Sequence, residues 1–303
     1  MPLNAERLHF SDLACYVAGQ GPPLLLVHSM NATGSAAEVR PLLDAFRTTH
    51  TVFALDLPGF GHSDQSDRPY NARLMTDALH AMAAHIHRRC GSAPIDALAV
   101  STGCEFLARA ASERPADWRH LALVSPTGLG GGKPRRGAPG STLGMPWLHR
   151  VLSVPLWSAA LYRGLTKPGV VRYFLQRTWG SKSIDEEMWA DAVQSAQAPG
   201  ARYAPLHFLA GDFFSADILN VYESLKQPVW ASHGVRGDFT DYRGQVHLKA
   251  KTNWRFSVFD SGALPYFEHP QAFNQQLGAF LAGQHAPADS ASPAAAAAPT
   301  AAA

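Results

Sequence analysis

The chain has 303 residues, enough to bury a full hydrophobic core in one large or two smaller domains. Apolar residues make up 46% of it and charged residues 17%, which excludes a mostly disordered chain and a fibrous repeat. The 26 lysines and arginines nearly balance the 24 aspartates and glutamates, and a formal charge of +2 is too small to indicate a nucleic-acid-binding protein.

The N-terminal residues carry charges and lack the apolar core of a signal peptide, and no apolar run reaches the roughly 20 residues of a membrane span. Cys15, Cys90 and Cys104 cannot all pair with one another and have no zinc-like spacing. Nicotinamide and flavin fingerprints are absent from the sequence. We therefore expect a cytoplasmic protein with no metal, no cofactor and no membrane association, and the sequence does not indicate its oligomeric state.

Apolar runs that alternate with helical stretches predict a parallel sheet covered by helices on both faces. The expected strands cover residues 23–27, 51–55, 95–100, 121–124, 229–231 and 255–259. The expected helices between the first four strands cover residues 37–46, 71–89 and 105–111. This order predicts the α/β fold class.

The character of the chain changes after the fourth of these strands, at the glycine-rich stretch 128–132. Helical segments follow without strands, and one is predicted to begin with a capping box at Ser183–Glu186. Tryptophan is concentrated in this insertion, whose rings either pack it onto the sheet or form an apolar roof over a cleft: Trp147, Trp157, Trp179 and Trp189. The predicted organisation is a core from 1–133 and 216–283, a helical cap from 134–215, and a disordered Ala/Pro-rich tail from 284–303.

Five segments carry a family resemblance in the right order: 27–30 (VHSM), 56–64 (DLPGFGHSD), 99–103 (AVSTG), 228–238 (PVWASHGVRGD) and 262–270 (GALPYFEHP). Together they resemble the oxyanion loop, the loop after the next strand, the nucleophile elbow, the acid turn and the terminal histidine segment of the α/β-hydrolase superfamily. The resemblance is to the capped serine-hydrolase branch. It implies a mostly parallel central sheet flanked by helices, with a helical cap inserted after the sixth strand.

The resemblance implies that Ser101 is the nucleophile, with backbone N–H groups of Met30 and Thr102 holding the oxyanion. A strand, a sharp turn and a helix place a serine at a helix N-terminus, where unpaired N–H groups favour developing negative charge. The alternative reading of Ser101 is an ordinary helix N-cap. Ser29, where the family has glycine in the oxyanion loop, is a departure from the pattern.

The general base is missing from its expected position. The residue aligned with the family's catalytic histidine is Ala263, which can neither accept nor donate a proton. The vacancy is natural, or engineered, or filled by another histidine, for which His269 and His247 are the candidates. Asp238 matches the acid, with Asp241 as the runner-up.

Two residues on the predicted elbow helix remain. We expect Cys104 to be buried in packing and Glu105 to lie on the helix surface.

The first functional hypothesis is a serine hydrolase or acyl-transfer enzyme with a degenerate triad, acting on a small apolar ester or carbonyl substrate. The second is a non-hydrolytic member of the fold. That member is either a ligand-binding protein or an enzyme that polarises a carbonyl at the oxyanion site without covalent catalysis.

Overall fold

The structure is a computed structural model that describes residues 3–284. Its centre is one eight-stranded sheet with the strand order β1-β2-β4-β3-β5-β6-β7-β8. β1 and β2 join the sheet antiparallel, and the later strands pair in parallel with one another. The strands are β1 (Glu6–Phe10), β2 (Leu13–Ala18), β3 (Pro23–Val27), β4 (Thr51–Asp56), β5 (Ile95–Val100), β6 (Trp118–Val124), β7 (Val229–Gly234) and β8 (Trp254–Phe259). The predicted mostly parallel α/β sheet is confirmed.

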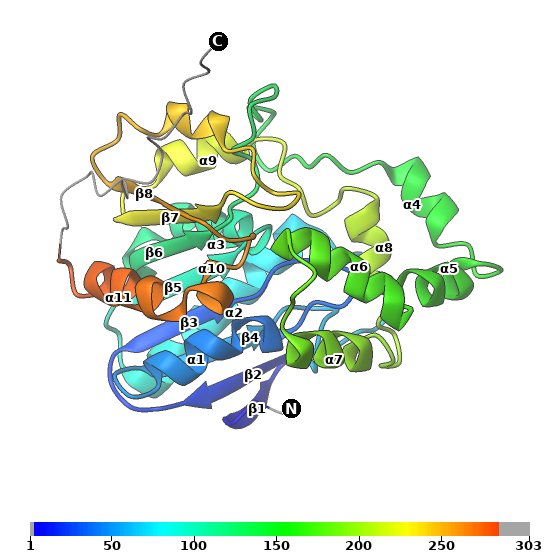
Figure 1. Ribbon diagram of the computed structural model, residues 1–303, viewed down its shortest axis with the longest axis horizontal. Helices are drawn as coiled ribbons and strands as arrows, with labels where there is room; N and C mark the ends of the chain where they lie inside the picture. Colours follow the sequence, from blue (N-terminus) through cyan, green and yellow to red (C-terminus); the bar gives the residue numbers. More distant parts are fainter. Residues whose placement is uncertain (1–2, 285–303) are drawn as a thin grey trace, which may run out of the picture.

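Helices cover both faces of the sheet (Figure 1). One face carries η1 (Ala36–Val39), α1 (Arg40–Phe46), α10 (Pro265–Glu268) and α11 (Pro270–Leu281). The other carries α2 (Ala72–Cys90), α3 (Gly103–Glu113) and α9 (Ile218–Ser224). Alternate residues of β3 divide between the two layers, Leu25 and Val27 in one core and Leu24 and Leu26 in the other. A strand buried on both faces needs a continuous apolar run, which is the pattern that the sequence shows there.

The helical cap lies between β6 and α9, after the sixth strand as predicted. It contains α4 (Pro146–Leu152), α5 (Ser158–Leu165), α6 (Pro168–Trp179), α7 (Glu186–Ser195) and α8 (Tyr203–Leu209). The shorter helices η2 (Pro115–Asp117) and η3 (Arg243–His247) lie in loops of the core. Figure 1 shows α4 and α5 at the edge of the molecule farthest from α11.

Three local predictions differ from the structure. No strand was predicted where β1 and β2 lie. These two strands form a hairpin, and its turn contains Ser11 with φ +50°. Helix α7 is capped by Asp185, whose carboxylate accepts the Met188 N–H at 2.7 Å, and not by a box starting at Ser183. The predicted tail lies outside the described residues except for Gln284. Within residues 3–284, no helix combines the length and apolarity needed to cross a membrane.

Candidate active site

Ser101 occupies a strained turn between β5 and α3. Its backbone has φ +52°, a left-handed conformation that is unfavourable for a residue with a side chain, and its N–H donates to the Val124 carbonyl at 2.8 Å. Helix α3 begins at Gly103 with Thr102 as its N-cap, so Ser101 precedes the cap. Thr102 is 1% exposed and Ser101 is partly exposed. The sharp strand–turn–helix arrangement therefore places Ser101 at the carboxyl end of β5.

Gly103 lets the start of α3 approach the loop after β3. A Cβ atom on Gly103 would lie 2.6 Å from the His28 carbonyl oxygen, which is closer than real Cβ contacts allow. The glycine is thus required by a close backbone approach. The contact joins the turn that carries Ser101 to the loop that carries Met30.

His28 is fully buried in this loop and is occupied on both ring nitrogens. Its Nε2 accepts the Leu57 N–H at 3.1 Å, so Nδ1 carries the proton and donates to the Ser29 carbonyl at 2.6 Å. Since neither nitrogen is free, His28 orients the loop and is not available as a base.

Ser29 is hydrogen-bonded to the buried carboxylate of Glu38, which was not among the predicted site residues. The Glu38 carboxylate accepts the Ser29 N–H at 2.5 Å and the Ser29 hydroxyl at 2.7 Å. Burial raises the pKa of Glu38 above its ordinary range, and these two hydrogen bonds oppose that effect. The departure from glycine at position 29 is therefore matched by a residue on η1 that fixes the loop preceding Met30.

The loop after β4 wraps around Asp56, which explains its glycines. The buried Asp56 carboxylate accepts the N–H groups of Ala36 and His62 at 2.7 and 2.8 Å. A Cβ atom on Gly61 would lie 2.1 Å from the same carboxylate, so only glycine fits there. Asp56 thereby ties this loop to the start of η1, two residues before Glu38.

Ala263, at the position expected for the base, is buried and has both backbone groups engaged. Its N–H donates to the Thr178 carbonyl at 2.9 Å, and its carbonyl accepts the Ser125 hydroxyl at 2.7 Å. Thr178 belongs to α6 of the cap. The last turn of α6 therefore packs directly on the loop after β8.

Asp238, expected as the acid, forms a two-pronged ion pair with Arg177 of the same cap helix. The Arg177 Nε and terminal N–H groups donate to the Asp238 carboxylate at 2.5 and 2.6 Å. Arg236, two residues from Asp238 in the sequence, lies against Glu268 instead. The runner-up, Asp241, accepts hydrogen bonds from Arg243 and from the Gly131 N–H. Both carboxylates are thus committed to arginines.

The two candidate substitute bases are held elsewhere. His269 Nε2 donates to the Asp260 carbonyl at 2.9 Å, and His269 is the residue that precedes α11. His247 is exposed at the end of η3 and lines a cavity of about 140 Å³ with the glycine-rich loop 128–132. None of the hydrogen bonds found within residues 3–284 joins either histidine to Ser101.

Glu105 is not on the helix surface, so that expectation is wrong. It is fully buried, and its carboxylate accepts from Thr127 and Arg135 at 2.5 Å and from the Ser215 N–H at 2.7 Å. This cluster joins α3 to both ends of the cap insertion. Cys104 is buried as expected, and burial raises the pKa of its thiol.

Sequence comparison decides the family. The model of the alpha/beta hydrolase family matches residues 19–276. The chain belongs to the alpha/beta hydrolase family. Among proteins with curated descriptions, none matches this sequence.

Solved structures of other family members have the same fold. A serine hydrolase involved in carbazole degradation superposes with a TM-score of 0.70 at 15% identity, over 89% of this chain and 94% of that one. A probable hydrolytic enzyme from Pseudomonas aeruginosa gives a TM-score of 0.70 at 19% identity, over 94% and 95%. The 2-hydroxy-6-oxo-6-phenylhexa-2,4-dienoate hydrolase of a Rhodococcus strain gives 0.69 at 18% identity, over 92% and 98%. At these identities the likeness is one of fold.

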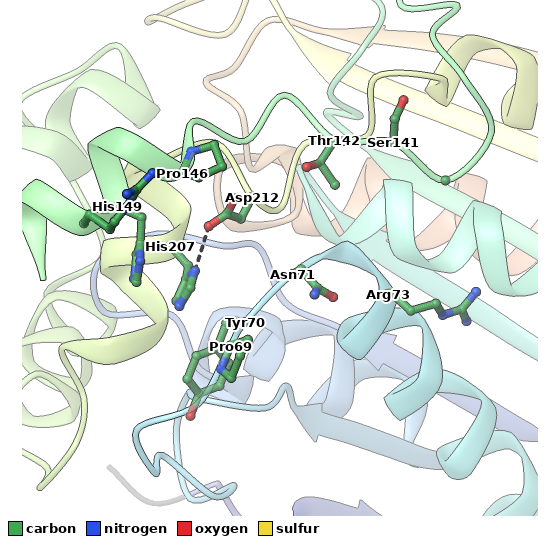
Figure 2. Close-up of a pocket in the computed structure, with 12 residues that line it drawn as sticks. Pro69, Tyr70, Asn71, Arg73, Ser141, Thr142, Pro146, His149, His207 and Asp212 are labelled. Carbon is green, nitrogen blue, oxygen red and sulfur yellow. Dashed lines mark hydrogen bonds and ion pairs between the residues drawn. The ribbon is translucent and has the colours of Figure 1, made fainter.

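A larger cavity of this alpha/beta hydrolase family member, of about 600 Å³, lies between the cap and the start of α2 (Figure 2). Among its lining residues, His207 donates from Nδ1 to the Asp212 carboxylate at 2.7 Å. The ring of His207 also stacks on that of His149, with 3.7 Å between the ring centroids. Burial and the neighbouring His207 lower the pKa of His149. None of the predicted site residues lines this cavity.

Ser141, the serine that lines this cavity, is not hydrogen-bonded to His207. The Ser141 hydroxyl donates to the Ala138 carbonyl at 2.6 Å, and Figure 2 shows Ser141 pointing away from His207. Sequence reasoning missed the cluster because its members come from α4, α8 and the α8–α9 connection. Within the described residues, no group of three or more histidine, cysteine, aspartate or glutamate side chains could hold a metal ion.

Proposed function

We propose that this protein is a serine hydrolase or acyl-transfer enzyme with a degenerate triad, in which Ser101 attacks a small apolar ester or related carbonyl. The left-handed backbone of Ser101 is the observation that carries the proposal. Such a conformation costs of order 1–3 kcal/mol, and it persists where a site needs a side chain held at a sharp turn. Family membership and the hydrolases among its structural relatives support the reaction class.

The neighbouring loop supports an oxyanion site. Glu38 fixes Ser29, and Gly103 brings the start of α3 against the His28 carbonyl, so the loop that carries Met30 lies against the turn that carries Ser101. One preorganised N–H donor at such a site typically contributes on the order of 100-fold or more to the rate. The proposed chemistry therefore depends more on this preorganisation than on proton transfer.

The proposed site lacks the base and the free acid that a catalytic triad uses for proton transfer. Ala263 provides no base, and Asp238 is neutralised by Arg177. Without a positioned base, a serine loses a factor of roughly 100 to 10,000 in reactivity. We therefore expect slow acylation of Ser101 in the natural protein.

A fluorophosphonate probe followed by intact-mass measurement tests this directly. We expect slow labelling of the natural protein and none of Ser101→Ala. Ala263→His should accelerate labelling by about 100-fold or more, and Ala263→His with Arg177→Met should accelerate it further, because the second change frees Asp238 to orient the new histidine. Ala250→His, at an exposed loop position, is the matched control and should leave the rate unchanged.

The same experiment addresses the alternative, a ligand-binding or non-covalent family member. The Arg177–Asp238 pair favours that alternative, because it commits the aspartate that best matches the acid position. If neither the natural protein nor the folded Ala263→His variants label at Ser101, the hydrolase proposal fails. If Ser101→Ala then keeps its action on a carbonyl substrate, non-covalent catalysis replaces it.

A further inference from the structure

The cap ends in an apolar surface that nothing in the described chain covers. This cap tip comprises α4, the turn from 153 to 157, and the flanking side chains of Leu143, Met145 and Leu209. Helix α4 has no buried residue at all. Leu156 is 86% exposed and Trp147 is 61% exposed, far beyond what folding of a single chain favours for such side chains.

The cap tip is ordered and not a frayed loop. Trp147 and Val151 are one helical turn apart on α4, so their side chains share a face. The Trp157 indole N–H donates to the Val151 carbonyl at 2.9 Å, which ties the turn after α4 back onto the helix. Figure 1 shows α4 and α5 projecting at the edge of the molecule beyond α6 and α8.

The segment of chain that contains the cap tip carries charges of one sign. Residues 126–184 contain nine lysines and arginines and no aspartate or glutamate. Ion pairs within the fold hold four of them: Arg135, Arg136, Arg172 and Arg177. Within the described part of the chain, no ion pair holds the other five: Lys133, Arg150, Arg163, Lys167 and Lys182.

Three of these unpaired cations belong to α4 or to the segment that directly follows the cap tip in the sequence. Arg150 is on α4, Arg163 is on α5, and Lys167 follows α5; all three are exposed. Two carboxylates lie near α4: Asp212 accepts a hydrogen bond from His207, and both Asp212 and Asp67 oppose the lowering of the His149 pKa. The cap tip and the segment that follows it therefore combine exposed apolar side chains with three cations that form no ion pair within residues 3–284.

We propose that the cap tip docks on an anionic lipid surface. Exposed tryptophan and leucine side chains enter the boundary between lipid headgroups and acyl chains, while nearby lysines and arginines are attracted to anionic headgroups. A symmetric contact between two copies of this chain would place the same cations opposite one another, which the charge pattern disfavours. The sequence-based expectation of no membrane association rested on the lack of a spanning segment, and a peripheral contact needs none.

This proposal goes beyond the catalytic one and does not depend on it. Binding at the cap tip uses no residue of the Ser101 site, so it can be tested without an activity assay. If both proposals hold, the cap of the enzyme faces the phase in which apolar esters accumulate.

Co-sedimentation of the full chain with lipid vesicles tests the proposal. We expect binding to vesicles of phosphatidylglycerol and phosphatidylcholine in equal parts, and little binding to phosphatidylcholine alone. Added salt should weaken binding because it screens the cations. Trp147→Ser with Leu156→Ser should abolish most binding. Arg150→Gln with Arg163→Gln and Lys167→Gln should weaken it by about fivefold for each cation removed.

Matched controls come from exposed residues elsewhere on the molecule. Val246→Ser with Val258→Ser removes two exposed apolar side chains, and Arg88→Gln with Lys226→Gln and Lys249→Gln removes three exposed cations. Both should bind like the natural protein, and near-ultraviolet circular dichroism checks that every variant is folded. Three results would each overturn the proposal: no binding to anionic vesicles, equal losses in the control variants, or sedimentation equilibrium showing that the cap tip holds two copies together.

Discussion

Removing the Glu38 carboxylate should destabilise the fold, because this carboxylate supports the loop after β3. The carboxylate is the partner of two donors of one residue, the Ser29 N–H and the Ser29 hydroxyl, in a fully buried place. In Glu38→Ala the N–H is left buried without a partner, which costs about 1–3 kcal/mol. The one methylene group that is lost adds about 0.8 kcal/mol.

Part of that cost is recovered. The Ser29 hydroxyl keeps a contact with the Asn31 amide nitrogen at 3.4 Å, and the variant no longer buries a carboxylate. The expected loss in the free energy of unfolding is therefore about 1–3 kcal/mol. In Glu38→Gln the amide oxygen can accept the Ser29 N–H while the amide nitrogen donates to the hydroxyl, so we expect a change within about 1 kcal/mol.

The pH dependence provides a second readout with a defined sign. Burial raises the pKa of Glu38 in the folded protein above the 4.5 of an exposed glutamate. The folded protein therefore keeps this proton over a range in which the unfolded chain has lost it. The contribution of Glu38 to stability is present below about pH 4.5 and is lost as pH rises through the folded-state pKa. Over that window Glu38→Gln should gain stability relative to the natural protein.

Urea unfolding followed by tryptophan fluorescence measures both effects. Glu223→Ala is the control, because Glu223 forms an ion pair with Arg136 at the surface and its loss should cost no more than about 1 kcal/mol. A loss below 1 kcal/mol in Glu38→Ala, or equal losses in Glu38→Ala and Glu38→Gln, would refute the assignment of Glu38 as the support of Ser29.

Two further stability predictions use matched residues. Gly103→Ala should lower the free energy of unfolding in urea by about 1–3 kcal/mol, because its Cβ would lie 2.6 Å from the His28 carbonyl oxygen. The control is Gly278→Ala in α11, whose Cβ meets nothing within 4 Å and should raise the free energy of unfolding by about 0.5–1 kcal/mol. Equal effects would contradict the close approach at the elbow. Burial and His207 lower the pKa of His149, so the protein should lose stability as pH falls below about 6.5, and thermal melts of His149→Gln should show less of this loss than those of exposed His9→Gln.

The sheet was predictable where burial on both faces imposes a continuous apolar run. Strands β3, β4 and β5 were placed within one residue of their observed ends. The β1–β2 hairpin was missed because β1 is an edge strand with exposed polar residues, so its pattern resembles a loop. The elbow was predictable because a strand, a serine and a close-approach glycine follow one another directly in the sequence.

The side-chain partners could not be predicted, because they come from distant segments. No charged residue lies within three positions of Glu105 in the sequence, yet Arg135 and Ser215 from the two ends of the cap insertion pair with its buried carboxylate. Asp238 has Arg236 two residues away in the sequence, yet the structure pairs it with Arg177, which is 61 residues away. Charge pairing across a fold depends on how the cap docks, which hydrophobic periodicity does not specify.

The docking of the cap bears on how the vacancy at Ala263 should be understood. The end of α6 contacts both loops that the resemblance assigns to the acid and the base: Thr178 binds the Ala263 N–H, and Arg177 binds Asp238. Both contacts at 263 use backbone atoms, so they do not depend on which side chain the residue carries. The fold therefore holds the base position whether or not a base is present, and the arginine compensates a carboxylate that has no histidine to orient. Under the proposed function, the low reactivity expected of Ser101 is therefore caused by two side chains and not by the backbone. Ala263→His with Arg177→Met should increase that reactivity more than either change alone.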